Sequence, residues 1–127
     1  MLAPAGAGDC GIFGNFVVPQ NYASAPTLVI GGVLGEAANT LGFGFAQIGI
    51  DHSSPINVAF DAEDLASNAT WTGLVAGDVY EEIITITPAS AFTVGQRVFF
   101  YFYREDGADT QTGAFHLTDL LFRYTTI

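Results

Sequence analysis

The sequence contains no lysine and only three basic residues, Arg97, Arg104 and Arg123, against 13 aspartates and glutamates. The formal net charge is therefore −10 at pH 7. The phosphate groups of DNA or RNA would repel such a chain, which excludes nucleic-acid binding as its role. The acidity would complement a basic surface on a protein partner, and it is equally consistent with an acidic proteome or a saline habitat.

Cysteine and long apolar runs are also scarce. Cys10 is the single cysteine, so no disulfide can form within the chain. No run approaches the ~18 uninterrupted apolar residues of a membrane helix, because Gly, Thr, Asp or Glu interrupts each one, and we expect no membrane partner. The first residues lack the basic segment and the continuous apolar segment of a secretory signal. We therefore expect synthesis in the cytoplasm, followed by use there or by export as part of a particle.

Apolar residues take the place of the missing charges. Half of the 127 residues are hydrophobic, 13% are aromatic and 13% are charged, whereas about 25% are charged in an average globular domain. The mean hydropathy is +0.37, which is high for a soluble monomer. Surplus apolar surface on a chain of this kind indicates that a partner covers part of it.

Short β-rich runs recur about every ten residues between turn-forming residues, which is typical of a β-sandwich or barrel. The small residues of 1–11 show no periodicity and predict a flexible N-terminal arm. The remaining residues, 12–127, suit one domain with a two-layer core. No βαβ alternation is present, so we predict an antiparallel all-β sandwich of about eight strands. The expected strands are 12–18, 27–34, 40–50, 57–60, 70–74, 78–87, 97–104 and 114–126.

Two local patterns add detail to this prediction. The Gly31-Gly32 pair inside the second run indicates a β-bulge or a close approach of another group to the backbone. Asp61 is a suitable N-cap for one helical turn over 61–66, which is the only helix that the sequence suggests.

The run RVFFYFYR at 97–104 is aromatic on both of its faces. Because strand side chains alternate, Val98, Phe100 and Phe102 point to one side, opposite Phe99, Tyr101 and Tyr103. A strand with one face in water should alternate apolar and polar residues. One face must therefore fill the core, and the other must be covered by a neighbouring subunit, a ligand or a loop.

The last run repeats this pattern more weakly. Alternation places Leu120, Phe122 and Tyr124 on one face and Leu117 and Leu121 on the other. Together the two runs supply the candidate interface residues, which are Phe99, Tyr101, Tyr103, Phe122 and Tyr124.

Nothing in the sequence selects a catalytic reaction, a metal or a cofactor. Asp51, His52 and Ser53 are neighbours in one loop, but a catalytic triad depends on spatial geometry, and a polar turn explains them better. The two histidines, His52 and His116, and Cys10 are too scattered to predict a zinc site. The glycine pairs lie inside strands rather than at a strand-to-helix turn, so no phosphate loop is present. We predict that the protein is not an enzyme.

Two weaker binding patterns remain open. The acidic segment 105–112 could bind calcium through its carboxylates, although it lacks the spacing of the twelve-residue calcium loop. Its alternative is a plain acidic turn in which Asp109 pairs with Arg104. Trp71 and Tyr22 could form an aromatic platform for a sugar, since jelly rolls bind carbohydrates, or they could belong to the core.

The segment FTVGQRVFFYFYREDGADTQTGAFHLTDLLFRY, 92–124, resembles the C-terminal part of a small jelly-roll domain of tailed-phage structural proteins. That domain joins an apolar strand to a turn in which this chain has Arg104, Asp109, Thr110 and Gly113. The segment FVVPQNY, 16–22, is similar to the opening hairpin of the domain. The resemblance spans about residues 13–126.

This resemblance implies a jelly-roll β-sandwich and a place in the virion. A short chain of this type is expected to be a capsid decoration or cement protein, which binds the outer shell of a bacteriophage and stabilises it through protein–protein contacts. Its partners would be the major capsid protein and copies of itself, in a dimer or trimer, with the N-terminal arm reaching a neighbour. The alternative is a receptor- or carbohydrate-binding module of a tail or fibre. The acidic segment 61–68 and the double-faced strand depart from the family pattern and leave the mode of attachment open.

Overall fold

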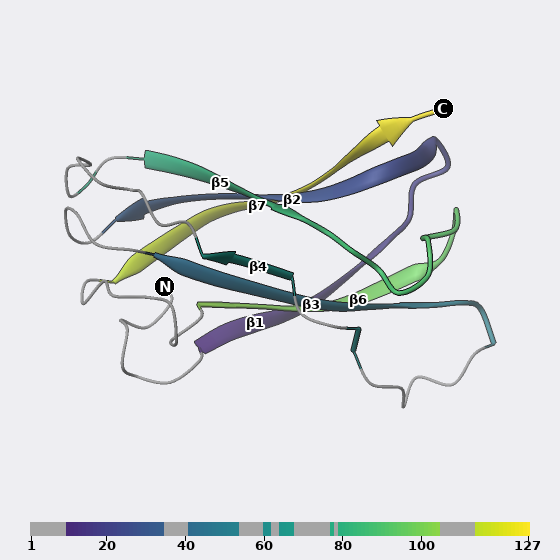
Figure 1. Cartoon of the computed structure of the whole chain (residues 1–127), viewed down its shortest axis with the longest axis horizontal. Helices are drawn as coiled ribbons and strands as arrows, with labels where there is room; N and C mark the ends of the chain where they lie inside the picture. The colour runs from purple at the N-terminus through teal and green to yellow at the C-terminus, as the bar shows by residue number, and fades with distance from the viewer. Residues whose placement is uncertain are drawn as a thin grey trace.

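The computed structural model describes residues 10–34, 41–53, 60–61, 64–67, 77, 79–104 and 114–127. These residues form seven β-strands and no helix (Figure 1). The strands are β1 (Cys10–Val17), β2 (Tyr22–Leu34), β3 (Gly42–Ile50), β4 (Asp64–Ser67), β5 (Val79–Thr85), β6 (Arg97–Arg104) and β7 (Phe115–Thr126). The predicted all-β class is therefore confirmed.

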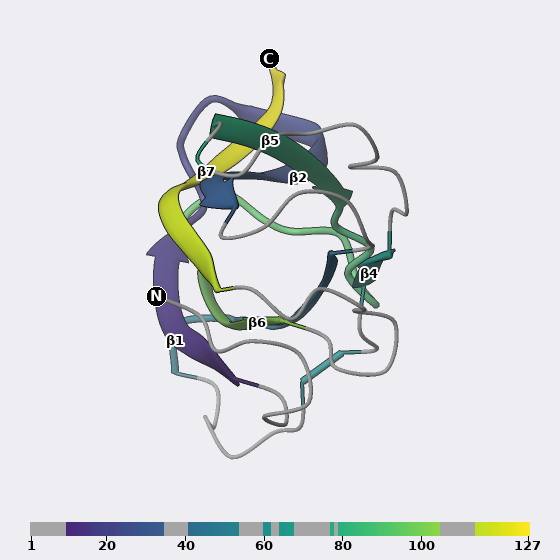
Figure 2. The same cartoon turned by 90° about the vertical axis from the view of Figure 1, so that its left-hand side faces the viewer.

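The strands form two antiparallel sheets that lie one over the other (Figures 1 and 2). The first, here called the β6 sheet, has the order β1-β6-β3-β4, and the second, the β2 sheet, has the order β5-β2-β7. The pairs are nested along the chain, because β1 pairs with β6, β2 with β5 and β3 with β4. β6 also pairs with β3, and β7 is added to the free side of β2.

The core fills the space between the two sheets with large apolar side chains. Phe43 from β3 contacts Phe102 from β6 and Phe115 from β7, with ring centroids 5.3 and 5.0 Å apart. All three rings are almost completely buried, and burial of each contributes about 1.5–3 kcal/mol. The other buried members of this cluster are Val18, Tyr22, Leu28, Ile30, Leu41, Phe45, Ile84, Ile86, Phe92 and Val98.

The predicted bulge at Gly31-Gly32 is confirmed. Gly31 is paired with Asp119 and Gly32 with Leu117, so the register of β2 against β7 shifts by one residue at Thr118. A Cβ atom on Gly32 would overlap the ring of Phe115, which explains why glycine is needed there.

The bulge also corrects the predicted faces of the last strand. Leu117 packs against the core cluster on the same side as Leu120, because the extra residue reverses the alternation between them. Leu121 points away from the core and is 48% exposed.

The predicted helical turn at 61–66 is wrong. Asp64–Ser67 forms strand β4, which pairs with β3 and so satisfies its backbone in a sheet ladder. Asp61 caps no helix, because its Oδ2 atom accepts hydrogen bonds from the backbone N–H of Ala89 at 2.9 Å and from Nε2 of Gln47 at 3.1 Å. The Asp61 carboxylate thus links Gln47 to Ala89, two residues that are far apart in the chain.

The other predicted segments differ in their bounds from the structure or lie outside the described residues. β1 begins at Cys10, so the last two residues assigned to the N-terminal arm belong to a strand. Phe60 lies outside the strands, and the other three residues of the predicted strand 57–60 are outside the described part of the chain. The predicted strand 70–74 and residues 1–9 are outside the described residues. No helix found in the described part of the chain is long and apolar enough to cross a membrane.

Candidate functional site

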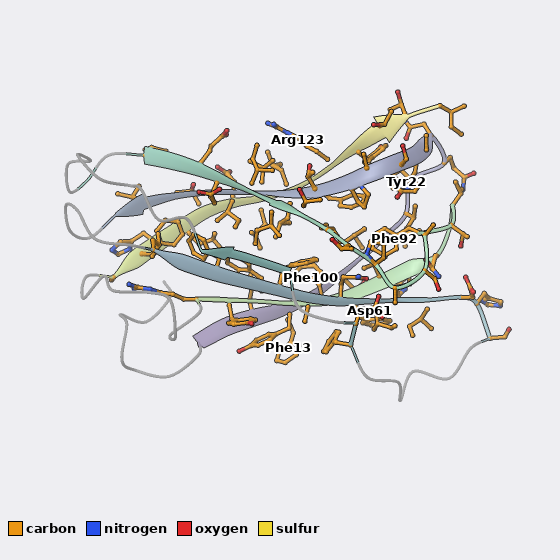
Figure 3. All side chains as sticks on the ribbon, in the orientation of Figure 1. Phe13, Tyr22, Asp61, Phe92, Phe100 and Arg123 are labelled. Carbon is orange, nitrogen blue, oxygen red and sulfur yellow. The ribbon has the colours of Figure 1, made fainter. Side chains whose placement is uncertain are left out.

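The outer face of the β6 sheet carries a row of aromatic side chains. On β6, Val98 and Phe102 are completely buried and Phe100 packs against the core cluster. The alternating side chains Phe99, Tyr101 and Tyr103 therefore lie on the opposite, outer face. In Figure 3, Phe100 lies between the sheets while Phe13 projects away from them beneath the β6 sheet. The prediction that 97–104 is aromatic on both faces is confirmed, and we call Phe13, Phe60, Phe99, Tyr101 and Tyr103 the aromatic face.

The rings of the aromatic face contact one another across strands. Phe13 on β1 is the cross-strand partner of Tyr101, and their ring centroids are 4.4 Å apart with 23° between the planes. Tyr101 stacks in turn on Tyr103 at 5.2 Å, and Phe60 lies 6.4 Å from Phe13. Such pairs contribute about 0.5–1.5 kcal/mol each beyond the burial of their area. The result is a continuous row of near-parallel rings.

Small residues on β3 make room for this row. Gly44 is the β3 partner of Tyr103, and Ala46 is the partner of Tyr101. A Cβ atom on Gly44 would overlap the Tyr103 ring, which therefore lies directly on the glycine backbone. This contact contributes to the burial of Tyr103, which is only 3% exposed although it points out of the sandwich. Glycine weakens an isolated strand, but on β3 it leaves space for the ring of a residue on the neighbouring strand.

Exposure increases along the row towards β1. Tyr101 and Phe99 are half-buried, Phe60 is 40% exposed and Phe13 is 75% exposed. A large apolar ring that is mostly in water, beside other partly exposed rings, is typical of an interaction surface.

The aromatic face is almost free of charge, although the chain is strongly acidic. β1, β6 and β3 contain no carboxylate, and their two charged residues are Arg97 and Arg104. Arg97 lies on the outer face and donates a hydrogen bond from Nη1 to Oδ1 of Asn15 at 2.6 Å. Glu81, Glu82 and Asp119 lie instead on the β2 sheet. The three strands β1, β6 and β3 therefore have no carboxylate, although the edge strand β4 of the same sheet contains Asp64.

One end of the aromatic face opens into a polar pocket of about 310 Å³. Asp51, His52 and Ser53 line it together with Arg97 and Phe99. Oδ1 of Asp51 accepts hydrogen bonds from Oγ1 of Thr93 at 3.4 Å and from Nε2 of Gln96 at 3.2 Å. Asp51 therefore fixes a neighbouring loop rather than orienting His52, and the three adjacent loop residues form no relay.

The structure brings together only part of the predicted interface. Phe99, Tyr101 and Tyr103 share the outer face of the β6 sheet, but Phe122 packs between the sheets with its ring 4.3 Å from that of Phe16. Tyr124 packs against Tyr22 at 5.7 Å, and its hydroxyl donates a hydrogen bond to Oδ1 of Asn21 at 2.8 Å.

Phe13 and Phe60 were missed by the sequence reasoning. The only available signal for Phe13 was its position between Ile12 and Gly14 in a predicted strand, where alternation places it opposite the residues that face the core. No pattern in the sequence identifies Phe60 as part of the same surface.

The remaining candidates give no site in the described residues. No group of three or more His, Cys, Asp or Glu among them is arranged to hold a metal ion. The possible calcium segment 105–112 and Trp71 lie outside the described part of the chain. Comparisons of the chain with family models, with curated proteins and with solved structures found no match. The aromatic face is therefore the candidate functional site of the described residues.

Proposed function

We propose that this chain is a structural protein of a tailed-phage virion, a capsid decoration protein that binds the outside of the shell through its aromatic face. The observation that carries the proposal is the row of stacked rings from Tyr103 to Phe13, which becomes more exposed towards β1. Aromatic residues are enriched in the buried centres of protein interfaces, and charged residues are depleted there. The major capsid protein would be the partner.

The strand pairing supports a fold of the jelly-roll type. A jelly roll is a long antiparallel hairpin wrapped into two sheets, so its strands pair in nested order. Here the nested pairs are β1 with β6, β2 with β5 and β3 with β4. Pairing of β6 with β3 joins the first and the third of these pairs into one sheet. β7 is an addition to this six-stranded arrangement. This nested pairing is the observation that supports the proposal of a jelly roll.

The charge distribution gives the mode of binding. The uncharged aromatic face would be buried against the shell, with Arg97 at its rim, while Glu81, Glu82 and Asp119 on the β2 sheet remain in solvent. Burial of about 800 Å² on each partner is typical of a stable interface. Packaged DNA presses outwards on a shell, and each additional interface of this size opposes the separation of its subunits.

Cosedimentation of the purified protein with isolated shells tests this proposal. We expect binding by the wild-type chain, and loss of at least tenfold in affinity for Phe13→Ala and for Tyr101→Ala, because each removes a ring from the interface centre. Ile83→Ala and Leu121→Ala are matched controls, since both remove an exposed apolar side chain from the β2 sheet. Binding that is equal for all four variants, or absent for the wild type, would reject the proposal.

A second candidate is a carbohydrate-binding module of a tail or fibre. It is favoured by the position of the pocket, where Arg97, Asp51 and His52 lie at the end of a row of rings. Sugar rings pack on aromatic faces, and polar groups nearby bind their hydroxyls. A glycan array separates the two functions: selective binding that disappears in Tyr101→Ala supports the module, and the absence of any bound glycan rejects it.

A further inference from the structure

In the described part of the chain the two sheets have four edge strands, which differ in how they are protected from other chains. An edge strand presents unpaired backbone N–H and C=O groups, and natural proteins commonly protect it with charged residues. β4 contains Asp64, β5 contains Glu81 and Glu82, and β7 contains Asp119 and Arg123. β1 has eight residues, CGIFGNFV, and none of them is charged.

The outer side of β1 is also open in the described part of the chain. There, β1 pairs only with β6, through an uninterrupted register from Cys10 opposite Arg104 to Val17 opposite Arg97. The side chains along β1 include the exposed apolar residues Ile12, Phe13 and Val17. A regular, uncharged edge of this length is a template for a further strand.

We propose that β1 pairs antiparallel with β1 of a second copy, so that the two β6 sheets form one continuous sheet. The strand is compatible with a two-fold axis at Phe13, because residues placed opposite each other then share a face. Phe13 would lie opposite its own copy on the outer face, and Ile12 would lie opposite Gly14 on the inner face. The aromatic faces of the two copies would become one surface.

The absence of charge on β1 makes this edge the place where two copies repel each other least. Two chains of net charge −10 repel each other, so they associate most easily through a surface without carboxylates. β1 and its neighbour β6 provide that surface, and the described acidic residues on β5 and β7 belong to the other sheet. Because salt screens the residual repulsion, the dimer should become more stable as ionic strength rises from about 0.02 to 0.5 M.

Sedimentation equilibrium of the purified chain tests the pairing without any shell, so its outcome is independent of the proposed function. We expect a particle of twice the 13.4 kDa chain mass. Phe13→Lys should reduce dimerisation at least tenfold, because it places two cations opposite each other on the joined strands. Ile83→Lys, a matched change at an exposed position of the β5 edge, should remain dimeric. Tyr101→Ala should also remain dimeric, since Tyr101 lies on β6 and not at the edge.

Two further measurements keep the test decisive if Phe13→Lys fails to fold. In the dimer, the backbone amides of β1 that point away from β6 should exchange with solvent more slowly as protein concentration rises. In a Cys10→Ser background, Phe13→Cys should form a covalent dimer on oxidation, because opposed residues lie within disulfide distance. A monomer at about 1 mM, a dimer lost in Tyr101→Ala but kept in Phe13→Lys, or β1 amides that exchange equally fast at all concentrations would overturn the proposal.

Discussion

The ring of Phe13 stacks on the ring of Tyr101, with 4.4 Å between centroids, and yet 75% of Phe13 is exposed. The two residues are partners across the β1–β6 ladder, so the contact is fixed by strand register rather than by a flexible loop. One side of the Phe13 ring is therefore held by its neighbour while the remainder faces solvent. A ring positioned in advance in this way loses little conformational freedom on binding, which favours its use as an anchor.

Phe13 and Phe102 should differ sharply when each is changed to alanine. Phe102 is completely buried between the sheets, so Phe102→Ala should lower the free energy of unfolding by about 3–5 kcal/mol. Phe13→Ala should cost about 1 kcal/mol, mainly from the lost stacking on Tyr101. Urea unfolding of both variants measures the difference. A cost for Phe13→Ala as large as that for Phe102→Ala would mean that Phe13 belongs to the core.

Gly32→Ala should destabilise the protein through contact with Phe115. The new Cβ atom would overlap the Phe115 ring, and overpacking of this kind costs about 1–3 kcal/mol. In a double-mutant cycle, Phe115→Leu should recover part of that cost. Gly95→Ala is the control, because φ is +81° there and nothing lies within 4 Å of the added atom. Its cost should come from backbone strain and should not depend on residue 115; equal coupling of both glycines to residue 115 would contradict the steric account.

Asp61→Ala should destabilise the protein by removing the acceptor for Gln47. Gln47 is completely buried, and its Nε2 donates to Oδ2 of Asp61 at 3.1 Å, while its Oε1 has no hydrogen-bond partner in the described residues. Loss of the acceptor leaves the amide unsatisfied, at a cost of about 1–3 kcal/mol. Replacing the amide as well, in Gln47→Met with Asp61→Ala, should recover part of that loss. Thermal unfolding of the single and double variants checks this, and strictly additive effects would contradict it.

Tyr22 should make the stability sensitive to alkaline pH. Burial raises the pKa of the Tyr22 hydroxyl above its ordinary value of 10.0. The folded state therefore holds this proton more tightly than the unfolded state. The contribution to stability is fully present below pH 10, and it is lost as pH rises from the unfolded pKa through the folded pKa. Denaturant unfolding between pH 8 and 11 should show a smaller alkaline loss for Tyr22→Phe than for the wild type, and identical profiles would contradict the assignment.

The sequence predicted which side chains share a face of a strand better than it predicted how the strand is placed in the two sheets. The bounds of β6 and the opposite orientation of Phe99 and Phe100 followed from alternation in RVFFYFYR. Alternation does not tell which face of a strand is inside, so Phe122 was assigned to an interface although it packs in the core. The stacking of Phe13 on Tyr101 was equally inaccessible, because it depends on pairing between segments that are far apart in the chain.

Local sequence signals gave wrong predictions where pairing with residues far apart in the chain determined the structure. Asp61 has the chemistry of a helix cap, but the residues after it pair with β3 and its carboxylate binds Gln47 and Ala89. The Gly31-Gly32 bulge was predicted correctly, because adjacent glycines inside a strand have few other uses. Its effect on Leu117 was not predicted, since it required the register of β2 against β7.

A side-chain-resolution cryo-EM map of the native phage particle tests the central claim most directly. We expect copies of this chain on the outer surface of the shell, with Phe13 and Tyr101 buried against a neighbouring protein and the β2 sheet facing solvent. Density for the chain at the tail tip or inside the shell would reject the proposed role, and so would an orientation in which the β2 sheet contacts the shell and the aromatic face remains in solvent.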